Sequence, residues 1–263
     1  MKHRILFKNY LSHFLAYRAR VGIWAVTDVA EFLVFPFIWL AVITDNIGIE
    51  GYGRADIITY YLIAAFVSLV FTSHPARKVK EDIMQGGLNA FLVKPLGHFS
   101  RHLIEQATYK ILSLGIGLGL MLPLVYFLPE YTYLPLSWTT WVFFTLSLLI
   151  AFFVSHLLEY TLGLASFWFG EIRALQHVLE IASILFSGRL APLVFFPPLF
   201  ASLAEWLPFA ALASIPADIY LERMTAAESV GQLSISALWL FVLSGLAILA
   251  WKRGLRRYEG IGI

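Results

Sequence analysis

The chain has 263 residues, of which 59% are hydrophobic and 14% are charged, and its mean hydropathy is +0.76. Soluble domains carry about 25% charged residues, so this composition excludes an ordinary soluble protein. A formal net charge of +2 is too small to indicate a nucleic-acid partner, and the lack of cysteine excludes disulfides and thiolate metal sites.

The first 20 residues predict a helix that lies on the membrane surface. Leu6, Tyr10, Phe14 and Tyr17 recur at helical spacing, and Lys and Arg residues lie among them. A helix with an apolar stripe and basic residues binds at the lipid headgroups. We therefore expect an N-terminal interfacial amphipathic helix over residues 1–20 and a single transmembrane domain over residues 21–263. The alternative for the first segment is a frayed cytoplasmic tail.

The rest of the chain predicts an all-α integral membrane protein with six transmembrane helices. A helix needs about 20 apolar residues to cross the hydrocarbon core of a bilayer. The predicted spans cover residues 21–43, 56–71, 103–128, part of 138–169, 174–186 with a continuation toward 196, and 233–251.

The basic residues orient these helices. Most of the 19 Lys and Arg residues lie before the first span, in the loop after the second span, or in the tail at 252–263. Since Lys and Arg gather on the cytoplasmic side of membrane proteins, this distribution places both termini in the cytoplasm. An even number of spans agrees with that placement.

A polar segment over residues 76–100 separates the second and third spans, and we expect it to contain a short helix. Two glycines allow a sharp turn, and three apolar residues then follow at i, i+3, i+4 spacing. Such an apolar ridge outside the membrane suits a groove on a partner protein. The alternative is a helix that lies on lipid without a partner. The residues of this predicted coupling segment are Glu81, Asp82, Gly86, Gly87, Leu88, Phe91, Leu92, Lys94 and Pro95.

Residues 187–232 lie on the outer side, yet they are largely apolar and are interrupted by prolines. A soluble outer loop would be more polar. We expect two short re-entrant helices that dip into the bilayer and return, because each is too short to cross it. The alternative is a single surface helix that faces lipid.

Two groups of ionisable residues fall inside predicted spans, where charge is costly and therefore a candidate for function. The first group joins Asp28 and Glu31, which share one face of the first span, to Lys110 in the third. We expect an ion pair that holds two helices together, and the alternative is a polar gate or substrate contact.

The second group consists of two His-x-x-Glu motifs, His156/Glu159 and His177/Glu180, on consecutive antiparallel helices. The pairs His156/Glu180 and Glu159/His177 both have position 168 as their midpoint in the sequence. A tight hairpin that turns at this position would therefore bring each histidine level with the glutamate of the other helix. Three interpretations compete: hydrogen-bonded interhelical pairs, a proton-linked or substrate-contacting cluster, and a zinc site. We expect the hydrogen-bonded pairs, with no metal in the chain.

The order of these features resembles the permeases of ABC-2 type exporters. Glu81-Asp82, Gly87 and Lys94-Pro95-Leu96 are similar to the family's coupling region after the second span. Phe186-Ser187-Gly188 and Leu207-Pro208-Phe209 look like its segments between the last two spans. Residues 251–258 are similar to the ending of a subgroup usually encoded as permease pairs. Lys80-Glu81-Asp82 departs from the family's Glu-Arg-Glu-like start, which leaves open which charges meet the partner.

The resemblance implies a permease subunit that works with a separate cytoplasmic ABC ATPase, which would bind the ATP and Mg²⁺. It also implies a second permease subunit, either the same chain or a related sister, export of a substrate, and the bacterial inner membrane as the location. The chain itself has no G-x-x-x-x-G-K-[ST] phosphate loop.

Two other classes stay open at this point. One is a membrane-embedded hydrolase or lipid transferase that would use His156, Glu159, His177 and Glu180. The other is a channel or accessory membrane subunit without an energy source. The sequence does not name the transported substrate.

Overall fold

The computed structural model describes residues 2–16, 23, 38, 41, 50–92, 97–127 and 129–258. The elements in these ranges are α-helices and short 3₁₀ turns, with no strand among them. The predicted first span at 21–43, with Asp28 and Glu31, lies outside the described residues apart from three isolated positions. Lys94, Pro95 and the last five residues also lie outside them.

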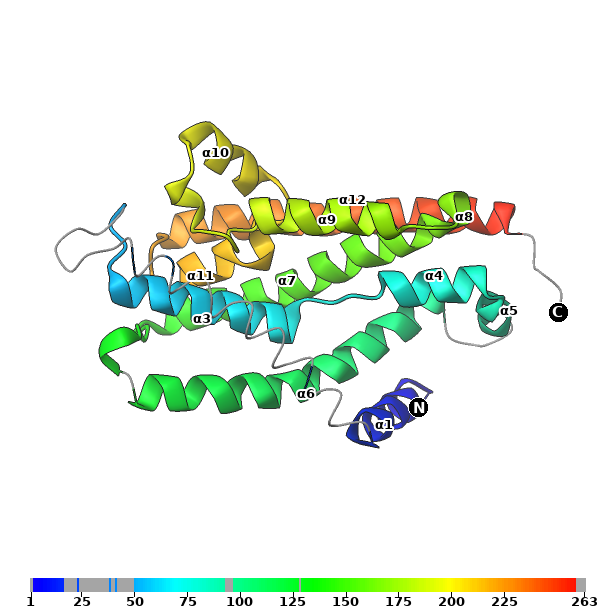
Figure 1. Ribbon diagram of the computed structural model, residues 1–263, viewed down its shortest axis with the longest axis horizontal. Helices are drawn as coiled ribbons and strands as arrows, with labels where there is room; N and C mark the ends of the chain where they lie inside the picture. The colour runs from blue at the N-terminus through cyan, green and yellow to red at the C-terminus, as the bar shows by residue number, and fades with distance from the viewer. Residues whose placement is uncertain are drawn as a thin grey trace.

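Four described helical stretches are long and apolar enough to cross a membrane. They contain the predicted second, third, fourth and sixth spans, and they run roughly along the long axis of the molecule (Figure 1). They cover Arg54–Met84, His98–Phe127, Trp138–Phe169 and Ala226–Arg257. The predicted total of six is therefore not reached among the described residues.

The first of these stretches is broken into α3 (Arg54–Phe71) and α4 (Ala76–Met84). The break falls at His74, because the residue before a proline is disfavoured in helical conformation. Side chains of α7 (Trp138–Leu164) occupy the break. The backbone N–H of Ser73 donates to Ser155 Oγ at 2.8 Å, and Ser73 Oγ lies 2.9 Å from His156 Nδ1. These polar side chains replace helix hydrogen bonds that the break removes.

The long helix α12 (Ala226–Arg257) packs along α7, which α8 (Ser166–Phe169) extends at one end. Thr225 caps α12, since its hydroxyl accepts from the Glu228 N–H while the Glu228 carboxylate accepts from the Thr225 N–H. Gly254 lets the far end of α12 lie close against α8, because any side-chain carbon at this position would overlap the ring of Phe167. The helices α4, α5 and α8 lie at the same end of the molecule as the C-terminal end of α12 (Figure 1).

The segment predicted as the fifth span, 174–186 with a continuation toward 196, forms only the short helix α9 (Arg173–Phe186), which is not among the four helices long enough to cross a membrane. Its 14 residues extend about 21 Å, against the roughly 30 Å of a hydrocarbon core. A turn at Ser187-Gly188 ends α9, and Gly188 has φ +85. The Tyr60 hydroxyl donates to the Gly188 carbonyl at 2.9 Å, which ties this turn to α3.

Two short helices, in place of one continuous surface helix, occupy the stretch after α9, and their re-entrant path in the bilayer stays a prediction. They are α10 (Pro198–Trp206) and α11 (Ser214–Tyr220), with 3₁₀ turns at Leu193–Phe195 (η2) and Ala210–Leu212 (η3). α11 is buried against α3 and α7, whereas α10 projects from the body of the molecule (Figure 1).

The N-terminal helix α1 (Lys2–Ala16) packs against α6 (His98–Phe127). Arg101 Nε donates to the Tyr10 hydroxyl at 2.8 Å, and the rings of Phe14 and Tyr109 lie 5.5 Å apart. A helix is thus present within the predicted range 1–20. A 3₁₀ turn at Pro129–Tyr131 (η1) follows α6.

Candidate functional site

The segment after α3 begins with α4, which has one apolar face and one charged face. Val79 and Ile83 are buried against α7, and Gly163 of α7 permits this contact because an added Cβ would lie 2.6 Å from Val79 Cβ. On the other face Arg77 pairs with Glu81 at 3.1 Å. α4 is therefore fixed to the helix bundle on one side and carries charge on the other.

One ion pair joins α4 to the turn between α8 and α9. Lys80 Nζ lies 2.7 Å from Glu171 Oε2. The hydrogen bond from Lys80, with a second from the Arg173 backbone N–H, lowers the pKa of Glu171. This contact links the coupling segment to the start of α9.

The sharp turn predicted at the two glycines is present. Gly86 has φ +74, a conformation that favours glycine, and α5 (Gly87–Leu92) starts directly after it. At Gly87 an added Cβ would lie 3.2 Å from Asp82 Cα, so the glycine lets α5 begin close against α4.

Two residues of the predicted docking surface point inward instead. Leu88 is completely buried in an apolar cluster that includes Val79, Ile83 and Leu164, and Asp82 is also buried. The physical reason is the glycine turn, which folds the first turn of α5 back against α4 rather than away from the body. The helix of α5 includes Phe91 and Leu92, whose side chains lie outside the described atoms, so their part of the ridge stays a prediction.

Asp82 meets two histidines from the first turns of α6. Its Oδ2 lies 2.9 Å from His102 Nε2 and 3.3 Å from His98 Nε2, and the two Nε2 atoms are 3.2 Å apart. All three residues are buried. This group was not predicted from the sequence, although His98 and His102 have the i, i+4 spacing that puts two imidazoles on one helix face.

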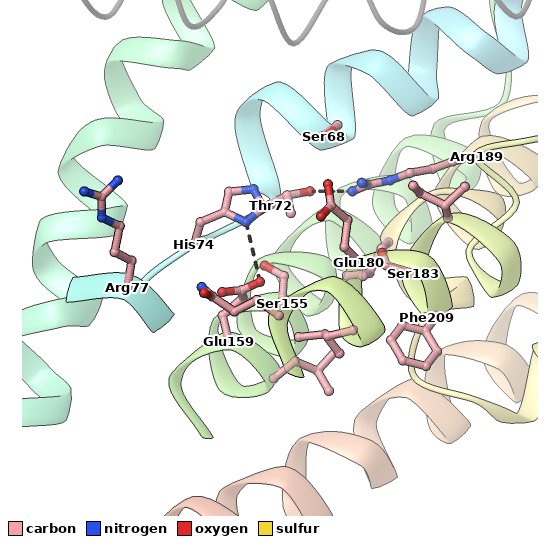
Figure 2. A pocket seen from close by; sticks show the side chains of 15 residues that line it. Ser68, Thr72, His74, Arg77, Ser155, Glu159, Glu180, Ser183, Arg189 and Phe209 are labelled. Carbon is pink, nitrogen blue, oxygen red and sulfur yellow. Dashed lines mark hydrogen bonds and ion pairs between the residues drawn. The ribbon is translucent and has the colours of Figure 1, made fainter. Parts of the chain in front are cut away.

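A polar cavity of about 440 Å³ lies between the end of α3, α7 and α9. Figure 2 shows polar side chains from these elements directed into it. His74 Nδ1 lies 3.7 Å from Glu159 Oε1, and Arg189 Nη2 donates to Thr72 Oγ1 at 3.3 Å. The residues that line it include Ser68, Thr72, His74, Arg77, Ser155, Glu159, Gln176, Glu180, Ser183 and Arg189.

The two His-x-x-Glu motifs find partners other than those predicted. His156 contacts Ser73, Glu159 contacts His74, and the exposed His177 lies 3.5 Å from Glu180 of its own helix. α8 ends at Phe169 and α9 begins at Arg173, so the hairpin centres near position 171 rather than 168. The described part of α9 also buries no residue and faces α7 across the polar cavity, so the tight hairpin that would have brought these side chains together is not formed.

These four residues therefore do not form the candidate zinc site or the enzyme centre considered from the sequence. Among the described residues, the His, Asp and Glu side chains that converge closely enough to bind a metal are Asp82, His98 and His102 instead. Lys110 is buried and donates from Nζ to the Leu69 carbonyl at 2.9 Å. Its predicted partners, Asp28 and Glu31, lie outside the described residues.

The long apolar helices and their exposed leucine, phenylalanine and tryptophan side chains define a multi-pass helical membrane protein. The chain belongs to the ABC-2 family of transporter proteins, whose family model matches residues 30–262. No curated protein matches the chain. The resemblance to the ABC-2 permeases is thus confirmed, and the subgroup indicated by the tail stays a prediction. Membership makes the chain a membrane component of a transporter and implies association with an ABC ATPase.

Proposed function

We propose that this chain is the permease subunit of an ATP-driven exporter in the bacterial plasma membrane. A separate ATPase would bind ATP and Mg²⁺ on the cytoplasmic side, where both termini of the permease would also lie. Two permease subunits, identical or related, would pack together around the transport path. The match to the ABC-2 transporter family supports this role, and these 263 residues carry no phosphate loop of their own.

The packing of α4 against α7 is the observation that carries the proposal. A coupling element must be fixed to the spans that it moves, and Val79 and Leu88 bury α4 and α5 in the same apolar cluster as Leu243 of α12. A force applied to α4 or α5 therefore reaches α7 and α12 through direct contacts. The opposite face of α4, with Arg77, Lys78 and Glu81, supplies the charged surface for the ATPase.

The polar cavity beside α9 supports a transport path at the face between two permeases. α9 contributes no buried side chain within the described structure, although its Gln176, Glu180 and Ser183 line the cavity. Polar groups at membrane depth are tolerated where they face protein or a water-filled space rather than lipid. A second permease packed against α9 would enclose these groups.

The test is a substitution in α5 of the permease, which is then purified from its native membrane together with whatever ATPase it binds. Leu92→Asp should weaken retention of the ATPase and reduce substrate-stimulated ATP hydrolysis, while the permease still inserts in the membrane. Phe169→Asp is the matched control, since it also places a carboxylate where an apolar side chain stood, at an exposed position of α8 at the same end of the molecule. The proposal is wrong if the purified complex contains no ATPase with a phosphate loop, or if Leu92→Asp behaves like the control.

A further inference from the structure

We propose that Asp82, His98 and His102 form a binding site for one divalent transition-metal ion of the zinc or iron type. The site would join α4 to the first turns of α6. It stands on the geometry of these side chains alone and does not depend on the transport role proposed above.

The three facing atoms have the spacing of a metal-ligand triangle. Asp82 Oδ2, His98 Nε2 and His102 Nε2 are separated by 2.9, 3.2 and 3.3 Å. Ligands about 2.05 Å from a tetrahedral zinc ion lie about 3.3 Å apart, and ligands on one face of an octahedral ion lie about 3.0 Å apart. An ion about 2.05 Å from all three atoms would sit about 1 Å out of their plane.

The second nitrogen of each ring also faces an oxygen, at hydrogen-bond distance for His98 and somewhat farther for His102. A metal-bound Nε2 leaves the proton on Nδ1, which must then donate to an oxygen. His98 Nδ1 lies 3.0 Å from the Tyr160 hydroxyl, and His102 Nδ1 lies 3.9 Å from Glu105 Oε2. Glu105 Oε2 is buried and has no hydrogen-bond partner in the described part of the chain, so an imidazole N–H turned toward it would satisfy it.

A hydrogen-bonded cluster without metal uses these groups less well. If both neutral rings donate from Nε2, both protons point at the single oxygen Asp82 Oδ2, although the two nitrogens are only 3.2 Å apart. Glu105 Oε2 then has no donor from His102 Nδ1, because a neutral ring with its proton on Nε2 has none on Nδ1. A cation bound by Asp82 Oδ2 and the two Nε2 atoms removes this crowding and leaves one proton on the Nδ1 atom of each ring.

A neighbouring ring holds the His98 imidazole in place, and a cavity lies beside it. The His98 ring stacks on Trp251 with centroids 5.0 Å apart and an interplanar angle of 20°. His98 also lines a cavity of about 370 Å³ between α6, α7 and α12. The three protein ligands leave the remaining coordination positions to water.

The ion would close the loop that contains α5. Asp82 lies before the glycine turn, whereas His98 and His102 lie after the loop, so the ion fixes both ends of the segment between them. This consequence deepens the proposed function, since the same segment is the one assigned to the ATPase.

The first experiment measures metal in the purified full-length protein by elemental analysis. We expect about one zinc or iron ion per chain, as for a buried three-ligand site. His102→Gln and Asp82→Asn should each remove it, whereas His177→Gln, a histidine of the exposed His-x-x-Glu motif, should retain it. Equal metal content in wild type and His102→Gln would overturn the proposal.

A second experiment avoids the risk that a ligand variant fails to fold. The wild-type protein is stripped with a chelator and titrated with Co²⁺ alone, and one equivalent should give visible absorption that Zn²⁺ displaces. Intense bands would indicate four-coordinate geometry, and weak bands six-coordinate geometry. Glu105→Gln should bind Co²⁺ about 10- to 100-fold more weakly, since it alters the partner of a ligating histidine. If stripped wild type binds no Co²⁺ and no Zn²⁺, the proposal is wrong, whatever the result for ATPase association.

Discussion

Replacing Leu88 with alanine distinguishes a structural role for this residue from a docking role. The Leu88 side chain is completely buried in the described structure, against α4 and α7. Loss of its methyl and methylene groups removes about 0.8 kcal/mol for each buried carbon, and the remaining cavity adds to this. Leu→Ala substitutions at such sites cost about 2–5 kcal/mol of folding stability. Near the lower end of that range, the midpoint of thermal unfolding should fall by about 5–10 °C.

The assay is thermal unfolding of the permease alone in detergent, followed by tryptophan fluorescence. Asn89→Ala is the control, because Asn89 is the next residue of α5 and is exposed. We expect a large decrease for Leu88→Ala and little change for Asn89→Ala. If the unfolding temperature of Leu88→Ala equals that of wild type while its binding to the ATPase is lost, Leu88 faces the partner and the arrangement of α5 described here is incorrect.

Of two further predictions, the first concerns the contact between α4 and α7, and the second concerns a hydrogen-bonded carboxylate at the opposite end of the molecule. Gly163→Ala should destabilise the permease by about 1–3 kcal/mol, because the new methyl group would push α4 away from α7; Gly231→Ala, at an open position of α12, is the control in the same unfolding assay. Hydrogen bonds from Tyr133 and Thr140 lower the pKa of Glu222 below its usual 4.5. Its stabilising effect is therefore complete above about pH 4.5 and disappears as the pH falls through the lowered value. Wild type should unfold at a higher temperature than Glu222→Gln at pH 7, and the difference should shrink toward pH 4; a difference independent of pH would contradict this assignment.

Much of the helical framework was predictable because it depends on local composition. Long apolar stretches indicated four of the helices that the structure describes, and the glycine pair indicated the turn between α4 and α5. Prolines after α9 indicated two short helices in place of one long one. In each case neighbouring residues in the chain supply the signal: hydropathy over about 20 residues, a positive φ that glycine accepts, or a missing backbone N–H.

The direction in which individual side chains point was not predictable in the same way. A helix in a membrane is apolar on all sides, so its hydrophobic pattern does not identify the face that packs on protein. The inward position of Leu88 and the contact of His156 with Ser73 depend on how α4 lies against α7. The predicted pairing of the two His-x-x-Glu motifs failed because a polar cavity lies between α7 and α9.

By itself, the sequence determined that this is a helical membrane protein with a polar segment between two of its spans. Only the tertiary structure brought Asp82 together with His98 and His102, because the ligands come from α4 and α6, on either side of α5. Such a cluster has no local signal beyond the i, i+4 spacing of the two histidines. It arises when the glycine turn and the packing of α4 on α7 return the chain to the start of α6.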